Sequence, residues 1–201
     1  MNDTSVGRLL VASLHQSIAD LLPTRLEFYE AWLTPVGQRE GRTGVAPLAA
    51  ALSFLRLEGA PYQLVATRAG EYTAEWTVTD LSQLRRHIIT SLPPAIRKRL
   101  VVGVARRMVR RTSDTTRVGV RWRRGHGVVE LRHSLFCDVR TRADHPLCEF
   151  YAAAFRRLLS LFSLDARVVI EQCHATGADP CALSVTLEAP LDGRRDEAVG
   201  A

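Results

Sequence analysis

The hydrophobic period of this chain changes near Ser113, and this change constrains the fold more than any other feature. Before it, apolar residues recur at the three- and four-residue spacing of helices; after it, they mostly alternate, as in strands. Helices are predicted at 5–22, 23–34, 46–57, 62–78, 80–92 and 95–112, strands at 116–123, 128–136, 165–173 and 181–187, and a further helix from about 148. This order predicts an α+β fold, in which an N-terminal helical layer packs on a roughly four-stranded antiparallel sheet with a crossing helix.

The length and composition favour a single domain. A chain of 201 residues, 46% hydrophobic and 24% charged, can bury a substantial core. We assign the domain to 1–188 and expect the small, charged residues 189–201 to form a flexible tail. No apolar run reaches the roughly 18 residues that span a bilayer, and the N-terminus lacks the features of a secretory signal. The protein is therefore expected in the cytoplasm, where its charge is compatible with a peripheral membrane contact.

The most function-bearing stretch is 146–187, which holds three of the four cysteines. Cys148 begins a helix, Cys173 ends a strand and Cys181 opens the next strand, so a helix crossing the final hairpin would bring the three thiols together. Glu171 lies on the same strand face as Cys173 if the side chains alternate. Three thiolates and one carboxylate are an acceptable tetrahedral zinc set. A cluster of reduced, buried cysteines and a redox pair of Cys173 with Cys181 are the alternatives.

The segment PLCEFYAAAFRRLLSLF, with VVIEQCHATGADPCALSV after it, resembles the C-terminal signature of the 4-vinyl reductase domain family, which is related in fold to the TRAPP vesicle-tethering subunits. The matching positions are Cys148, Glu171, Cys173, Gly177 and Cys181. The resemblance implies a structural zinc on the three cysteines and the glutamate, a hydrophobic cavity under the helices that takes a small apolar ligand, and a homodimer formed through the helices. Cys137 falls outside the signature and is interpreted as a core or edge thiol.

Aromatic residues at helical spacing supply the candidate walls of that cavity: Phe28, Trp32, Phe54, Tyr62, Trp76 and Phe150. Aromatic residues in such positions more often belong to the core, so the pocket depends on the resemblance. The sequence contains no GxSxG, HExxH, Walker or GxGxxG motif, and therefore no nucleotide cofactor is expected. These features favour a non-enzymatic binding or carrier module over an enzyme, with a lipid, an aromatic compound or a tetrapyrrole as the small hydrophobic ligand.

The net charge is +6, and Lys98 is the only lysine among 27 basic residues. Seven basic residues surround the apolar stripe of the helix at 95–112: Arg97, Lys98, Arg99, Arg106, Arg107, Arg110 and Arg111. Five of them, the arginines at 97, 106, 107, 110 and 111, are the candidate contacts for an anionic surface. A solvated face is the default interpretation. The alternative is a dimeric interaction or tethering protein that contacts an anionic membrane or an acidic partner through these arginines. Nucleic acid is disfavoured because a stacking platform and a recognition helix are lacking. Assistance in (bacterio)chlorophyll vinyl reduction is a third function, which follows from the resemblance alone.

Overall fold

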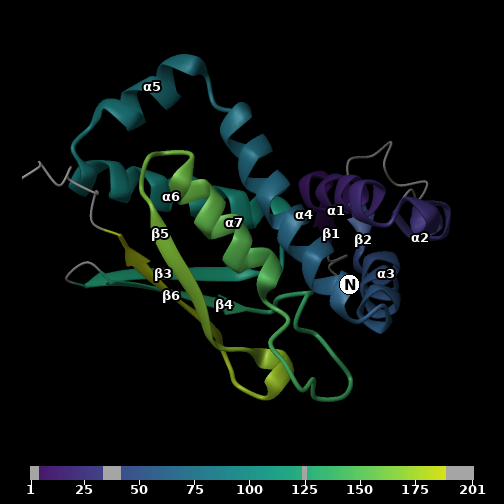
Figure 1. Ribbon diagram of the computed structural model, residues 1–201. Helices are drawn as coiled ribbons and strands as arrows, with labels where there is room; N and C mark the ends of the chain where they lie inside the picture. The colour runs from purple at the N-terminus through teal and green to yellow at the C-terminus, as the bar shows by residue number, and fades with distance from the viewer. Residues whose placement is uncertain (1–4, 34–41, 124–125, 189–201) are drawn as a thin grey trace, which may run out of the picture.

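The computed structural model describes residues 5–33, 42–123 and 126–188 and confirms the predicted α+β class (Figure 1). The helices are α1 (Arg8–Leu21), α2 (Leu26–Leu33), α3 (Val45–Leu57), α4 (Ala60–Thr79), α5 (Gln83–Ser91), α6 (Pro94–Thr112) and α7 (Glu149–Ser160), with short 3-10 turns η1 (Pro23–Arg25) and η3 (His174–Thr176). The strands are β1 (Ser5–Gly7), β2 (Arg42–Gly44), β3 (Arg117–Arg123), β4 (His126–Arg132), β5 (Ala166–Gln172) and β6 (Cys181–Leu187). The tail expected at 189–201 lies outside the described residues. None of the helices described is both long and apolar enough to cross a bilayer.

The main sheet consists of two antiparallel hairpins placed side by side, in the strand order β3-β4-β6-β5. The hairpins join where β4 pairs with β6, which puts Leu131 opposite Cys181. The side chains of β4 alternate between a covered and an open face: Val129 and Leu131 are buried, while Val128, next to Val129, is 42% exposed. In Figure 1, α6 and α7 lie over one face of this sheet, and α1, α2 and α3 gather beside the long helix α4.

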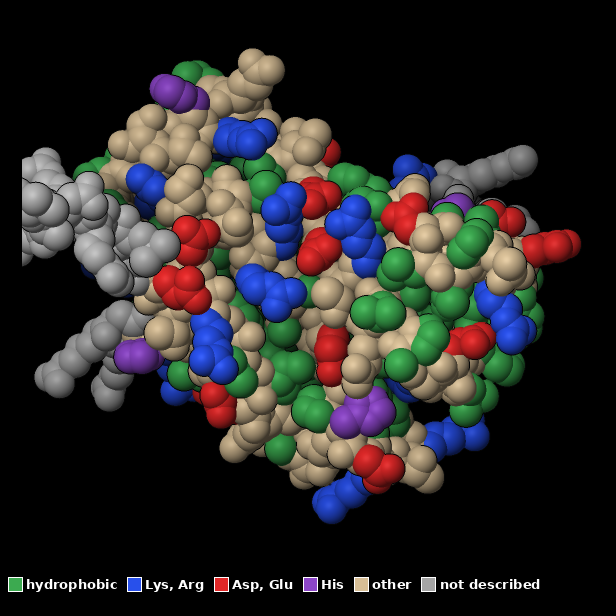
Figure 2. Space-filling model, in the orientation of Figure 1, with side chains coloured by type: hydrophobic (Ala, Val, Ile, Leu, Met, Phe, Trp, Pro, Cys, Tyr) green, Lys and Arg blue, Asp and Glu red, His purple; other side chains and the backbone are tan. Residues whose placement is uncertain are grey.

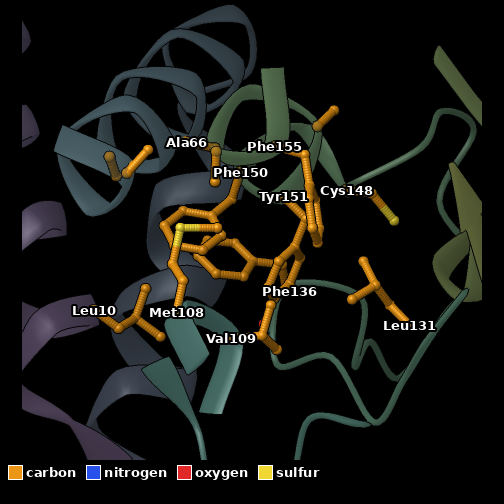
Figure 3. Close-up of a cluster of buried hydrophobic side chains, with 14 of the residues drawn as sticks. Leu10, Ala66, Met108, Val109, Leu131, Phe136, Cys148, Phe150, Tyr151 and Phe155 are labelled. Carbon is orange, nitrogen blue, oxygen red and sulfur yellow. The ribbon is translucent and has the colours of Figure 1, made fainter. Parts of the chain in front are cut away.

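The helical layer joins the sheet through a close contact between α4 and α7. A Cβ atom added at Gly70 would lie 2.1 Å from the carbonyl oxygen of Phe150, so the two backbones approach at a distance that only glycine allows. Beneath this contact, the rings of Phe136 and Phe150 stack with centroids 4.4 Å apart, and Tyr151 meets both edge-on (Figure 3). The space left where α6 and α7 face the sheet is about 20 Å³, enough for a single water molecule.

The elements differ from the prediction mainly at their ends. The first helix begins later than predicted because Ser5–Gly7 pairs with Arg42–Gly44 in a small two-stranded sheet that was not expected. The helix predicted at 80–92 begins later, at Gln83, because Ser82 caps it: the Ser82 hydroxyl accepts a hydrogen bond at 3.3 Å from a backbone N–H in the first turn. Asp80 instead ends α4 and forms a salt bridge.

Candidate functional site

The four cysteines Cys137, Cys148, Cys173 and Cys181 meet at one end of the main sheet and are called the thiol cluster below. The Sγ atoms of Cys137 and Cys148 lie 3.2 Å apart, those of Cys148 and Cys173 3.3 Å, and those of Cys173 and Cys137 3.6 Å. All four sulfurs lie within 4.8 Å of one another, and all four thiols are buried and free of disulfides. Four sulfurs at this spacing form a donor set for one thiolate-preferring metal ion.

Each cysteine stands at the boundary of a secondary-structure element. Cys148 is the N-cap residue of α7, Cys173 is that of η3, and Cys181 is the first residue of β6. Cys137 follows β4 in a turn that α3 holds in place: the Arg56 guanidinium donates hydrogen bonds of 3.2 and 3.1 Å to two carbonyl oxygens of this turn. The cluster therefore closes only when β4, α7 and the β5–β6 hairpin have all reached their places.

Glu171 does not join the thiol cluster, which corrects the predicted ligand set. The register between β5 and β6 shifts between Ile170 and Gln172, and such a bulge breaks the alternation of side chains on which the prediction depended. The Glu171 side chain is exposed and accepts a hydrogen bond of 2.6 Å from the hydroxyl of Ser184. The fourth sulfur of the thiol cluster is that of Cys137, which lies outside the sequence signature. Sequence reasoning could have included this residue, because it is the one cysteine left when the other three are predicted to converge.

Backbone N–H groups donate to two of the sulfurs. The N–H of Leu147 lies 3.3 Å from Cys173 Sγ, and the N–H of the residue after Cys173 lies 3.1 Å from Cys181 Sγ. Hydrogen bonds with the thiols of Cys137, Cys148 and Cys181 hold the pKa of Cys173 well below its ordinary value, because they favour the thiolate. The same network raises the pKa of Cys148, whose hydrogen bonds with Cys137 and Cys173 favour its thiol form. The cluster therefore favours negative charge at Cys173, and a thiolate is the form of cysteine that binds a metal ion.

A pocket of about 350 Å³ opens beside the thiol cluster and shares Cys181 with it. Its walls combine apolar and polar side chains from segments far apart in the sequence: Val45, Thr115, Leu131, His133, Ser134, Leu135, Asp138, His174, Asp179 and Cys181. Ser134 is 5% exposed, and its hydroxyl has no hydrogen-bond partner in the described part of the chain. Apolar walls with a few convergent polar groups are typical of small-molecule sites. No local motif could have predicted this pocket, because the fold assembles it.

The six aromatic residues predicted as pocket walls do not surround one cavity. Phe28, Trp32 and Phe54 form a cluster on the outer surface of α2 and α3, with ring centroids 5.3 Å apart for the Phe28–Phe54 pair and 5.7 Å for the Trp32–Phe54 pair. Phe28 is 48% and Phe54 40% exposed, and Figure 2 shows hydrophobic side chains gathered over these two helices.

The other three predicted walls lie elsewhere. Trp76 is half-buried and stacks on Tyr72, while Tyr62 and Phe150 are buried in the core. The hydroxyl of Tyr62 donates to the carbonyl oxygen of Leu147 at 3.4 Å, so this side chain has a structural role next to the thiol cluster. Helical spacing identifies an apolar stripe, but it does not tell which neighbour covers the stripe.

The five arginines predicted to contact an anionic surface divide into two groups. Arg97 and Arg106 donate to backbone carbonyl oxygens of neighbouring segments and so tie α6 to its surroundings. Arg107, Arg110 and Arg111 are exposed, and Arg111 forms a salt bridge with the end of α4. The predicted face is therefore partly structural and partly open to solvent.

No family model matches the sequence, and no curated protein matches it, but solved structures do. An H-NOX protein from K. algicida, in a mutant form with unliganded Fe(II), has a TM-score of 0.60 at 10% identity, covering 92% of this chain and 98% of that one. An H-NOX protein from S. oneidensis in the Fe(II)NO state has a TM-score of 0.55 at 12% identity, covering 91% and 99%. The phenol-responsive sensory domain of the transcription activator PoxR, solved with phenol, has a TM-score of 0.50 at 16% identity, covering 74% and 82%. At such identities these matches show a shared fold.

The matches correct two expectations. The structural neighbours are H-NOX proteins and a phenol-responsive domain, and no family model matches, so the assignment to the 4-vinyl reductase family and its TRAPP relatives is wrong. The H-NOX neighbours bind haem iron and not zinc, which overturns the zinc that the sequence suggested as a cofactor. One neighbour was solved with iron that carries NO, and another with phenol; neither supports the predicted dimer or membrane contact.

Haem itself does not fit the residues of this chain. Haem iron in proteins is held by an axial side chain, most often a histidine, next to a space for the macrocycle. None of the six histidines is buried: five are exposed, and the half-buried His15 pairs with Glu30 at 3.0 Å. In the described interior, the stacked rings of Phe136 and Phe150 fill the core beneath the α4–α7 contact, and the space where α6 and α7 face the sheet measures about 20 Å³. We therefore assign no role to haem.

Proposed function

We propose that this chain is a non-enzymatic sensory or carrier module that binds a small molecule in the pocket beside the thiol cluster. The observation that carries the proposal is the Ser134 hydroxyl, a buried polar group without a partner at the wall of a 350 Å³ pocket. A buried hydroxyl that lacks a hydrogen bond costs stability, and a ligand that supplies the bond gains affinity. The fold shared with domains that respond to small molecules supports the same function.

The pocket favours a small aromatic molecule with one hydrogen-bonding group over a lipid or a tetrapyrrole. Its volume of about 350 Å³ is close to the lower end of the roughly 300–1,000 Å³ range of small-molecule sites. Leu131 and Leu135 offer contacts for a ring, while Ser134, Asp138 and His174 offer donors and acceptors for a hydroxyl group. The PoxR sensory domain was solved with phenol, which supports this ligand class.

Titration of the isotope-labelled protein with phenol and substituted phenols tests the proposal. We expect the amide resonances of residues that line the pocket to shift. Ser134→Ala should weaken binding about threefold to tenfold, as the loss of one hydrogen bond would, and Ser53→Ala on the exposed face of α3 should leave it unchanged. Equal binding by Ser134→Ala and the parent, or shifts confined to another surface, would contradict the proposed site.

We also propose that the thiol cluster holds one thiolate-preferring metal ion, which clamps the β5–β6 hairpin to α7. Four thiolates complete a tetrahedral coordination sphere and leave no position open for a substrate, so this ion would stabilise the fold and take no part in catalysis. The two backbone N–H groups that donate to sulfur support the assignment, because they favour the thiolates that such an ion needs.

Titration of the reduced protein with cobalt(II), whose thiolate complexes absorb visible light, tests the metal site, together with metal analysis of the purified chain. Cys137→Ser should lower the cobalt affinity at least about tenfold, since a hydroxyl replaces a thiolate ligand. Glu171→Gln is the matched control and should change nothing, because its side chain is exposed and faces Ser184. The assignment fails if the reduced parent binds no cobalt, or if only the Glu171 variant loses binding.

A further inference from the structure

A second concave site lies between α5 and α6. In Figure 1, α5 lies at the opposite end of the ribbon from the turn between β5 and β6. This α5–α6 cleft has a volume of about 590 Å³. Its floor is apolar and is formed by Leu81, Ile88, Ile89, Leu100 and Val104. Ile88 is 49% and Leu100 42% exposed, so two large aliphatic side chains of the cleft face solvent. Aliphatic side chains exposed together in a hollow are typical of a binding site.

Arginine side chains line the rim of the cleft on both helices. Arg85 comes from α5, and Arg99, Arg107, Arg110 and Arg111 come from α6. Asp80 lines the cleft as well, and its carboxylate is paired with Arg111 at 2.6 Å. Within residues 5–33, 42–123 and 126–188, the guanidinium groups of Arg85, Arg99, Arg107 and Arg110 have no hydrogen-bond or ion-pair partner. A rim with four unpaired guanidinium groups attracts anions, above all carboxylate and phosphate.

Gly103 keeps the middle of the cleft open. It lies on α6 among the residues that line the cleft, and a Cβ atom added there would meet no atom within 4 Å. Glycine in the middle of a helix costs roughly 1 kcal/mol relative to alanine, and no backbone approach requires it at this position. The sequence thus keeps an unfavourable helix residue at the point where a side chain would fill the hollow.

We propose that the α5–α6 cleft binds a single anionic amphiphile, a molecule with an alkyl or acyl chain and a carboxylate or phosphate head group. The chain lies on the aliphatic floor, and the head group is held by arginines of the rim. An anion without a chain would leave the floor exposed, and an uncharged chain would leave the guanidinium groups without a partner. A membrane surface fits less well, because the aliphatic side chains lie in a hollow between two helices and not on a protruding face.

Calorimetric titration of the full chain with monomeric dodecanoate and dodecyl phosphate tests the proposal. We expect saturable binding of one molecule per chain, which weakens about fourfold for each methylene removed from the alkyl chain. Acetate and inorganic phosphate should not bind detectably. Vesicles of phosphatidylglycerol distinguish a membrane surface from a free amphiphile: binding to vesicles without binding of either monomer would overturn the proposal.

Matched variants locate the site. Arg85→Gln should weaken binding of both amphiphiles several-fold, whereas Arg86→Gln, its neighbour outside the cleft, should not. Gly103→Leu should abolish binding by filling the hollow, and it should leave the fold intact because leucine is the better helix residue. Unchanged affinity in Gly103→Leu would overturn the assignment. Phenol titrations of the same variants serve as the control. Phenol should bind to the pocket beside Ser134 in these variants as tightly as in the parent.

Discussion

The thiol cluster and the α5–α6 cleft are built in opposite ways. Four separate segments meet at the thiol cluster, every sulfur is buried, and hydrogen bonds from the backbone and from neighbouring thiols surround it. The cleft is formed by two helices adjacent in sequence, and four of its arginines are unpaired within the described residues. In Figure 1, α6 lies between α5 and the sheet, and α6 is the helix against which α5 packs.

Because of this difference, we expect the sheet end to be rigid and the α5–α6 cleft to be able to change its shape. Buried, satisfied contacts between distant segments make the sheet end cooperative, so a change there should affect the whole domain. A helix that packs on one partner can shift or open at a small cost in free energy. The sheet end thus suits a fixed site, and the cleft suits a ligand that adjusts the spacing of two helices.

The largest effect is expected where α4 meets α7. Gly70→Leu places a side chain where a Cβ atom alone would lie 2.1 Å from the Phe150 carbonyl oxygen, so the two helices must separate. We expect a loss of about 3 kcal/mol or more in the free energy of unfolding, measured by urea denaturation. Gly103→Ala on α6 is the control and should raise stability by up to about 1 kcal/mol. If the two substitutions changed the free energy of unfolding equally, the proposed difference in packing between the two regions would be wrong.

The aromatic residues provide the next test. Phe136→Ala removes a fully buried ring that stacks on Phe150 and should cost about 3–5 kcal/mol. Phe54→Ala removes a ring that is 40% exposed on α3 and should cost about 1 kcal/mol or less. Both values come from the same denaturation measurement. A cost for Phe54 equal to that for Phe136 would mean that the surface aromatic cluster is covered in solution.

Hydrogen exchange should resolve the two regions without any substitution. We expect the backbone amides of α5 to exchange at least about tenfold faster than those of α7, because α5 has one buried residue, Ile89, and α7 has eight. Exchange followed by mass spectrometry on peptides from 83–91 and 149–160 provides the comparison. Dodecanoate should slow exchange in α5 if the cleft binds it. Protection of α5 equal to that of α7 in the free protein would contradict the assignment of α5 as the weaker element.

The smallest effect concerns an exposed hydrogen bond between α1 and α4. The hydroxyl of Tyr72 donates to the Asp20 carboxylate and lowers its pKa. A carboxyl group whose pKa is lower in the folded state contributes stability above its unfolded pKa and loses that contribution as the pH falls through its folded pKa. Tyr72→Phe should therefore raise the pKa of Asp20 towards its ordinary value, seen by NMR titration of the side-chain carboxyl. It should also flatten the dependence of stability on pH below about 4. No change in this pKa would contradict the contact.

Local sequence patterns predicted the class of fold and most of its elements. The change of hydrophobic period near Ser113 separated helices from strands, and Val118 and Val120 showed the alternation that places β3 in a sheet. Three members of the thiol cluster were predicted because helix starts and hairpin ends converge in a small sheet. These features depend on neighbours in sequence or on simple topology.

Features that depend on packing were not predictable. The bulge at Glu171 turns a carboxylate away from the sulfurs, and the sequence pattern of β5 does not predict this bulge. The partnerless Ser134 hydroxyl becomes visible only when distant segments enclose it. The apolar stripe predicted on the helix at 95–112 is buried at its C-terminal end, at Val104 and Met108. It is open at its N-terminal end, at Ile96 and Leu100, because α5 covers the stripe only in part.

The pairing of β4 with β6 also sets the order in which the molecule is completed. Leu131 lies opposite Cys181, a partner fifty positions further along the chain, with all of α7 and β5 in between. Contacts that close such long loops form late, after the local helices. During synthesis the thiols of Cys137 and Cys148 emerge well before Cys181, so they stay open to oxidants and to stray metal ions until the last strand docks.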